Sequence, residues 1–199
     1  MDRRSTLFLT RAALIAALYV VLSEVSQLLG LCSGVIQCRI SEALTILPAF
    51  LVEAIPGLYI GCLLTNILTG CAAWDIAFGP VATLLGALVT YAIGRAVRAR
   101  AYHKPTDADG NVSMKASFGR FILITIMYVI PPILANAMII PPILRYAYGA
   151  EDAYWFLTCT VAAGEIIACG IFGGLLHAAI VKNAGLRNLI LTPTEKRPA

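Results

Sequence analysis

The stretch ISEALTILPAFLVEAIPGLYIGCLLTNILT at residues 40–69 decides how often this chain crosses a membrane. It carries two apolar runs, 40–52 and 55–69, and each is shorter than the ~20 residues that a helix needs to cross a bilayer core. The Pro56-Gly57 pair separates them, since proline and glycine favour turns. Two short spans and one re-entrant hairpin both fit this pattern.

Four longer apolar stretches flank these two runs. They cover residues 10–30, 78–97, 121–140 and 154–181. The 199-residue chain is 59% hydrophobic and only 13% charged, with a mean hydropathy of +0.83, whereas a soluble domain carries roughly 25% charged residues. So few charges cannot cover a soluble domain of this size. We therefore predict an all-α integral membrane protein with one transmembrane domain over residues 1–199.

The basic residues set the orientation of the spans. Thirteen of the fifteen lysines and arginines lie in three segments, namely the N-terminus to Arg11, the connection 95–120 and the tail from Lys182. Positive residues accumulate on the cytoplasmic side of a membrane, so these segments share that side. We predict a six-helix transmembrane bundle with both termini cytoplasmic and a cytoplasmic loop at 98–119. Charge alone fits four spans plus a hairpin equally well.

Three further features carry structural expectations. Pro131 and Pro132 fall inside the fifth span, where they remove backbone hydrogen bonds, so we expect a broken or kinked helix. Glu53 falls at a predicted cytoplasmic turn and is interpreted as a solvated or helix-end charge. Cys32 and Cys38 lie in a predicted loop, where free thiols are favoured over a disulfide.

Metal sites and catalytic machinery are not expected. The six cysteines form no C-x-x-C pair, and the two histidines, His103 and His177, lack partners at ligand spacing. No lysine stands in a nucleotide-binding loop of the G-x-x-x-x-G-K-[ST] type. We expect no cofactor, no nucleic-acid partner and no enzyme activity. Any uphill transport must draw on an ion gradient or on a partner protein.

Polar side chains inside the spans point to a binding pocket, because each is costly in a bilayer. A rise of ~1.5 Å per residue places most of them in the outer half of the membrane, with Glu165 the deepest acid at about 16 Å from the outer entry. The candidate substrate-binding residues are Glu24, Arg39, Glu42, Asn66, Trp74, Asp75, Asn136 and Glu165.

Two interpretations of this set remain. The first is internal ion pairing, for example of Arg39 with Glu42 or Asp75, which stabilises the bundle without binding anything. The second is an outward-opening pocket for a small, flat, polar solute. Carboxylates accept its N–H groups, the asparagine amides read a carbonyl, and an aromatic side chain such as Trp74 stacks on its ring.

The first span carries a candidate docking surface. Small side chains one turn apart let another helix approach closely, and two such pairs lie in its cytoplasmic half. The pairs are Ala12 with Ala16 and Ala13 with Ala17. Because they lie about 10 Å or more along the helix from Glu24, we expect them to contact a partner helix rather than the solute.

The sequence resembles the QueT family, whose members are substrate-binding S components of energy-coupling factor (ECF) transporters, proposed to take up queuosine precursors. The similar stretches are QCRISEALTILP at 37–48, EAIPGLYIG at 53–61 and DIAFGPVATL at 75–84, with Asn136 and Gly164-Glu165 in the later spans. The resemblance extends over most of residues 10–182. It implies that the region 40–69 forms two helices rather than one re-entrant hairpin.

This resemblance implies a vitamin-uptake role in the plasma membrane. An S component binds its small-molecule substrate, here a 7-deazaguanine, from the outer side. A transmembrane coupling subunit and two cytosolic ATPases then drive uptake. The main alternatives are a gradient-driven secondary transporter and an S component for another vitamin-like solute. A membrane enzyme is a less favoured alternative.

The pocket residues receive specific roles. A 7-deazaguanine offers N1–H and an exocyclic amine side by side, and Glu165 is our first choice for accepting both. Arg39 and Glu42 touch the ligand or brace the loop from Gly30 to Arg39. Asp75 pairs with Arg39 or meets a cationic substituent of the ligand.

Overall fold

The structure is a computed structural model that describes residues 3–32, 36–102, 118–183 and 185, and its regular elements are all helical. In chain order these are α1 (Arg3–Leu28), η1 (Ile40–Ala49), α2 (Ala54–Leu68), α3 (Ala73–Tyr102), α4 (Phe118–Tyr146), α5 (Tyr154–Glu165), η2 (Ile166–Phe172) and α6 (Gly173–Lys182). The predicted all-helical class is confirmed.

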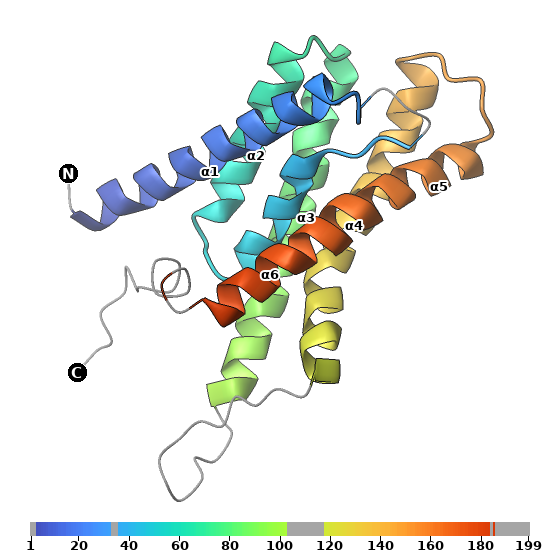
Figure 1. The fold of residues 1–199 in the computed structure, drawn as a ribbon. Coiled ribbons are helices and arrows are strands. Elements are labelled where there is room, and N and C mark those ends of the chain that lie inside the picture. The colour runs from blue at the N-terminus through green and yellow to red at the C-terminus, as the bar shows by residue number, and fades with distance from the viewer. Residues whose placement is uncertain (1–2, 33–35, 103–117, 184, 186–199) are drawn as a thin grey trace, which may run out of the picture.

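Four helical stretches are long and apolar enough to cross a membrane. They are α1, α3, α4 and the run from α5 through η2 to α6. The helices η1 and α2 are apolar but shorter. Figure 1 shows α5 and α6 following one another along one line. The chain is a helical membrane bundle, and six crossings with both termini in the cytoplasm stay a prediction.

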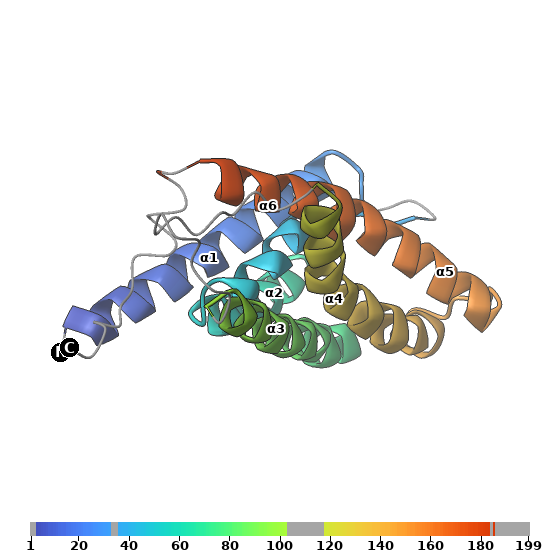
Figure 2. The same ribbon diagram turned by 90° about the horizontal axis from the view of Figure 1, so that it is seen from below.

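The short helix η1 occupies the middle of the bundle. It packs against α1, α2, α3, α4, η2 and α6, and every residue of Ser41–Ala49 is buried. Its backbone is a 3₁₀-helix, which rises about 2.0 Å per residue and so stretches ten residues over about 20 Å. Seen from below in Figure 2, the longer helices surround this segment. The region 40–69 therefore forms two separate helices, with the connection at 50–53.

The turn between η1 and α2 differs from the expectation for Glu53. This side chain is only 3% exposed, and its carboxylate forms an ion pair with Arg11 of α1 at 3.3 Å. A buried carboxylate needs a partner of opposite charge, and Arg11 lies close enough to supply it. Glu53 is thus a buried, paired charge at the start of α2. Its interpretation as a helix-end charge is confirmed, and the alternative of a solvated charge was wrong.

Helix α4 runs unbroken through Pro131 and Pro132, so the expected break was wrong, while a kink at this point stays a prediction. Proline at 132 leaves the carbonyl of Tyr128, four residues earlier, without its helical donor. The hydroxyl of Thr90 in α3 donates a hydrogen bond of 3.0 Å to that carbonyl. Gly86 lets the two helices meet here, since a Cβ on it would lie 2.7 Å from the Cα of Pro132.

Two of the four alanines predicted to dock a partner pack against another helix of the same chain. Ala12 and Ala16 are 7% and 6% exposed and face glycines of α2. A Cβ on Gly57 would lie 2.7 Å from the carbonyl oxygen of Ala12, and one on Gly61 would lie 3.1 Å from that of Ala16. This small-residue contact joins α1 to α2 and corrects the expectation that all four alanines face a partner. The neighbouring pair, Ala13 and Ala17, is exposed.

The predicted loop 98–119 lies mostly outside the described residues. Helix α3 extends to Tyr102 and α4 begins at Phe118, so both helices reach into that range. His103, for which the sequence predicts no metal site, also lies outside the described part of the chain.

Candidate substrate-binding site

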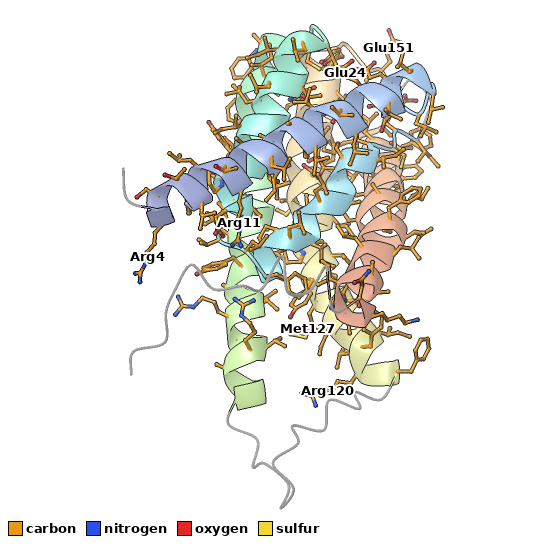
Figure 3. The ribbon with its side chains drawn as sticks, turned by 60° about the vertical axis from the view of Figure 1, so that its left-hand side comes forward. Arg4, Arg11, Glu24, Arg120, Met127 and Glu151 are labelled. Carbon is orange, nitrogen blue, oxygen red and sulfur yellow. The ribbon has the colours of Figure 1, made fainter. Side chains whose placement is uncertain are left out.

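A polar cavity of about 590 Å³ opens between the helices at one end of the bundle. Its walls come from α1, η1, α2, α3, α4 and α5 and from the connections between them. The connection from α4 to α5 supplies Tyr148, Ala150 and Asp152. Figure 3 places Glu24 and Glu151 at this end and Arg120 at the opposite end. The cavity therefore lies at the end of the bundle away from Arg120.

Five of the eight predicted binding residues line this cavity. They are Arg39, Glu42, Asp75, Asn136 and Glu165. They come from four different helices and one connection, so residues up to about 130 positions apart in the sequence meet in one space.

The inner part of the cavity holds two carboxylates. Glu42 is 3% exposed, and the hydroxyl of Tyr19 donates a hydrogen bond to its Oε1. Glu165 accepts a hydrogen bond of 2.9 Å from the amide of Asn136 at Oε1 and one of 3.2 Å from the thiol of Cys169 at Oε2. Glu42, Glu165 and Cys169 each offer a ligand atom within 4.8 Å of the others. Of the described residues, this is the group that could hold a metal ion, although the sequence predicted none.

The two carboxylates are positioned by irregular helix geometry. Glu42 lies in the first turn of the 3₁₀-helix η1, and Glu165 is the last residue of α5 before the π-helical turns of η2. π-Helical turns within α-helices are frequent at functional sites. Next to Glu165, Gly164 lets the backbone of Gln37 pack directly on α5, where a side chain would collide with the Gln37 carbonyl oxygen.

Arg39 bonds a buried amide rather than an acid. Its guanidinium donates a hydrogen bond of 3.1 Å to Oδ1 of Asn66, and the amide of Asn66 donates one of 2.9 Å to the backbone carbonyl of Asp75. Among the described residues, no carboxylate lies within ion-pairing distance of Arg39. Ion pairing of Arg39 with Glu42 or Asp75, one of the alternatives left open by the sequence, is thus not present among the described residues. Asn66 is fully buried behind Arg39 and is not part of the cavity wall.

Tyr148 is a cavity residue that the sequence did not single out. Its hydroxyl donates a hydrogen bond of 3.2 Å to the Asp75 carboxylate and accepts one of 2.9 Å from the backbone N–H of Ala72. Partial burial, together with the nearby Asp75 charge, raises the pKa of Tyr148 to about 12. The phenol therefore stays protonated at neutral pH and remains a donor to Asp75.

Two predicted binding residues lie away from the cavity. Trp74 is 62% exposed and stacks on Phe78 of its own helix, with ring centroids 5.7 Å apart. Glu24 is half-buried and does not reach the cavity wall. Within the described part of the chain, its Oε1 is buried without a hydrogen-bond partner. The aromatic rings that do line the cavity belong to Tyr148 and Phe156.

Helix α5 holds four of the wall residues that were missed. They are Phe156, Leu157, Thr160 and Val161. Residues four positions apart lie on one face of a helix, so counting back from Glu165 in steps of four leads to Val161 and Leu157. Glu165 itself was the signal that could have identified these two. The connections hold no comparable period, and their wall residues Cys32 and Gln37 carried no such signal.

The two cysteines near the cavity mouth, Cys32 and Cys38, are free thiols, as favoured from the sequence. The thiol of Cys32 lies 3.9 Å from the carbonyl oxygen of Cys38. Burial raises the pKa of both thiols. Cys32 belongs to the cavity wall and is half-buried, while Cys38 is buried.

Comparison with known proteins places these features in one family. The sequence model of the QueT transporter family matches residues 9–182, which covers the described bundle almost completely. No curated protein and no solved structure matches the chain. A family match of this extent fixes membership, and the chain belongs to the QueT transporter family.

Proposed function

We propose that this transporter-family protein is the substrate-binding S component of an ECF importer and that it binds a 7-deazaguanine precursor of queuosine from the outer side of the plasma membrane. The observation that carries the proposal is the polar cavity with the Glu42 and Glu165 carboxylates in its inner part. The cavity opens at the end of the bundle opposite Arg120. The distribution of basic residues assigns Arg120 to the cytoplasmic side and the end with the opening to the outside.

The chemistry of the wall suits such a ligand. Glu165 is the acceptor for N1–H and the exocyclic amine of the base, and Asn136, which bonds Glu165, is near enough to fix its orientation. Phe156 offers an apolar ring face for stacking in place of Trp74. Asp75 and Asp152 near the opening favour a ligand substituent with positive charge.

The energy source is assigned to partner proteins. The sequence contains no nucleotide-binding loop of its own. ATP hydrolysis therefore belongs to two cytosolic ATPases, which act through a transmembrane coupling subunit. The chain itself binds and releases the solute, has both termini in the cytoplasm and crosses the membrane six times.

Ligand binding by the purified chain in mild detergent tests the proposal. We expect calorimetry to detect 7-deazaguanine binding to the chain alone. Glu165→Gln keeps the size of the side chain but replaces an acceptor with a donor, which leaves buried groups unpaired at a cost of ~1 to 3 kcal/mol. The matched control is Glu151→Gln, an exposed acid at the same end of the bundle, and it leaves the affinity unchanged.

Transport separates the proposal from its main alternative. Liposomes that contain the chain alone bind the ligand without accumulating it, and accumulation needs the coupling subunit and the ATPases. Ion-gradient-driven uptake by the chain alone would instead establish a secondary transporter. An unchanged dissociation constant for Glu165→Gln would remove Glu165 from the site.

A further inference from the structure

One carboxylate oxygen in the cavity wall has an unused hydrogen-bonding capacity. Oε2 of Glu42 is buried and has no hydrogen-bond partner among the described residues, although the side chain is only 3% exposed. The other oxygen, Oε1, accepts from Tyr19. A buried acceptor without a donor costs free energy, so a group from elsewhere must supply the missing donor.

Glu165 lies directly beside this oxygen. Ligand atoms of the two carboxylates lie within 4.8 Å of each other, and both side chains belong to the wall of the same cavity. Two ionised carboxylates this close repel one another, and the repulsion is relieved when one of them is protonated or when a positive charge or several N–H groups lie between them. The basic residue of the wall, Arg39, directs its guanidinium toward Asn66. N–H groups of a ligand in this cavity can supply those donors.

The partners of the two acids define what kind of group fits. Tyr19, Asn136 and Cys169 all donate to the carboxylates, so the acids act as acceptors in this arrangement. Glu165 alone accepts two parallel N–H groups from a heterocycle edge. With Glu42 beside it, the pair accommodates a third N–H on the far side of the same exocyclic amine.

We propose that Glu42 is a second specificity residue, which accepts at Oε2 the outer N–H of the ligand's exocyclic amine, while Glu165 accepts N1–H and the inner N–H. The preferred ligand class is thus a flat heterocycle with three N–H groups in a cyclic guanidine arrangement and an unsubstituted amine. This inference rests on the proposed function and adds a residue and a selectivity to it.

Calorimetry on the purified full chain tests the third N–H directly. The probes are 7-deazaguanine and N2-methyl-7-deazaguanine, which keeps N1–H and one amine N–H but carries a methyl group in place of the other. We expect the wild-type chain to bind the methylated compound at least about tenfold more weakly, as loss of a hydrogen bond to a charged group predicts.

The Glu42 variants separate hydrogen bonding from general disturbance. Glu42→Ala removes the acceptor and makes room for the methyl group, so we expect the preference for the unmethylated compound to disappear. Glu42→Gln keeps the volume and lowers affinity for 7-deazaguanine but not for the methylated compound, and it serves as the second variant if the alanine protein does not fold. Glu151→Gln, at an exposed acid outside the cavity wall, keeps the tenfold preference.

Several results would overturn the inference. Equal affinity of the wild-type chain for both compounds removes Glu42 from the ligand edge, and so does an undiminished preference in both Glu42 variants. Loss of binding after EDTA treatment would show that Glu42 and Glu165 hold a metal ion instead. If 7-deazaguanine itself does not bind, the proposed function fails and the inference with it, and this outcome differs from equal binding of both compounds.

Discussion

The hydroxyl of Thr90 in α3 donates a hydrogen bond of 3.0 Å to the carbonyl of Tyr128 in α4, the very carbonyl that Pro132 deprives of its helical partner. Thr90 is fully buried. In a lipid environment no water replaces a missing donor, so neighbouring helices must supply it. This contact replaces the helical hydrogen bond that Pro132 removes from α4.

We predict that Thr90→Val lowers the thermal midpoint of the purified chain. Valine has nearly the same shape but no donor, so the Tyr128 carbonyl loses its partner at a cost of ~1 to 3 kcal/mol. Thr83→Val in the same helix is the control, because the Thr83 hydroxyl bonds the Gly79 carbonyl of its own helix at 3.3 Å. Equal midpoints for the two variants would show that the Thr90 bond does not support α4.

The sequence was sufficient for the helices but insufficient for this bond. Long apolar stretches predict spans, because a bilayer imposes their length, and the proline pair correctly marked where backbone partners are missing. Which neighbour supplies the donor depends on how α3 and α4 face each other. That relation is set by Gly86 against Pro132 and has no local sequence signal.

A second prediction concerns the contact that positions Glu165. Gly164→Ala places a methyl group against the carbonyl oxygen of Gln37, and because the collision is with backbone, the connection before η1 must shift. We expect a clearly lower thermal midpoint and weaker ligand binding. Gly174→Ala in α6 is the control, since the nearest atom to its Cβ would be the Thr125 methyl at an ordinary 3.6 Å. A Gly164→Ala protein as stable as the Gly174→Ala protein would contradict the tight packing of Gln37 on α5.

The third prediction concerns Arg39 and its buried partner. The bonds from Arg39 to Asn66 and from Asn66 to Asp75 connect the residue before η1 to α2 and α3. We expect Arg39→Ala to speed ligand release more than it slows association, because it loosens one wall of the cavity. Stopped-flow measurements give both rates.

The control for Arg39 is a double-mutant cycle. Asn66→Ala should have a similar effect, and the double variant should be little worse than either single one, since residues of one network are not additive. Arg4→Ala removes the same charge from the exposed start of α1, away from the cavity, and leaves release unchanged. Equal dissociation rates for Arg39→Ala and the parent would refute a bracing role.

The candidate site was predictable where its residues are polar and lie inside a predicted span or next to its end. Glu42, Asn136 and Glu165 stand out because a bilayer makes them costly, and Arg39 and Asp75 stand out because they lie next to apolar runs. The prediction of a binding role was not supported for Trp74, which lies outside the cavity wall at the start of α3. An exposed aromatic side chain costs little at a helix end. The sequence did not predict wall residues in the connections, such as Tyr148. A connection has no regular period, so its sequence does not predict which way a side chain points.

Cys32 offers a fourth prediction, with a chemical readout. Burial raises the pKa of its thiol, so less thiolate is present at neutral pH. We therefore expect Cys32 to be alkylated more slowly than a free model thiol. The reaction should become faster as the pH is raised through the thiol pKa. Because Cys32 lines the cavity, saturating ligand should slow its alkylation further. Mass spectrometry of the labelled peptides follows each cysteine separately. Cys159 is exposed outside the cavity wall and should show no protection, and equal labelling of Cys32 with and without ligand would place the ligand elsewhere.

The last prediction separates the two alanine pairs of α1. Ala13 and Ala17 are exposed on a face that also carries Leu14 and Leu18, at 59% and 44% exposure. Close approach of a partner helix depends on small side chains. Under the proposed function, Ala13→Trp together with Ala17→Trp should leave the stability and ligand affinity of the solitary chain intact, yet abolish ATP-dependent uptake in the assembled complex.

The buried pair supplies the matched control on the same helix. Ala12→Trp or Ala16→Trp forces bulk into the contact with Gly57 and Gly61 of α2, so the isolated chain itself should lose stability before any partner is added. Thermal unfolding of the chain alone, ligand calorimetry and uptake by the reconstituted complex therefore give a different pattern for each pair. Normal uptake and a normal amount of assembled complex with tryptophan at 13 and 17 would show that this face meets only lipid, and would shift support to a secondary transporter that needs no partner.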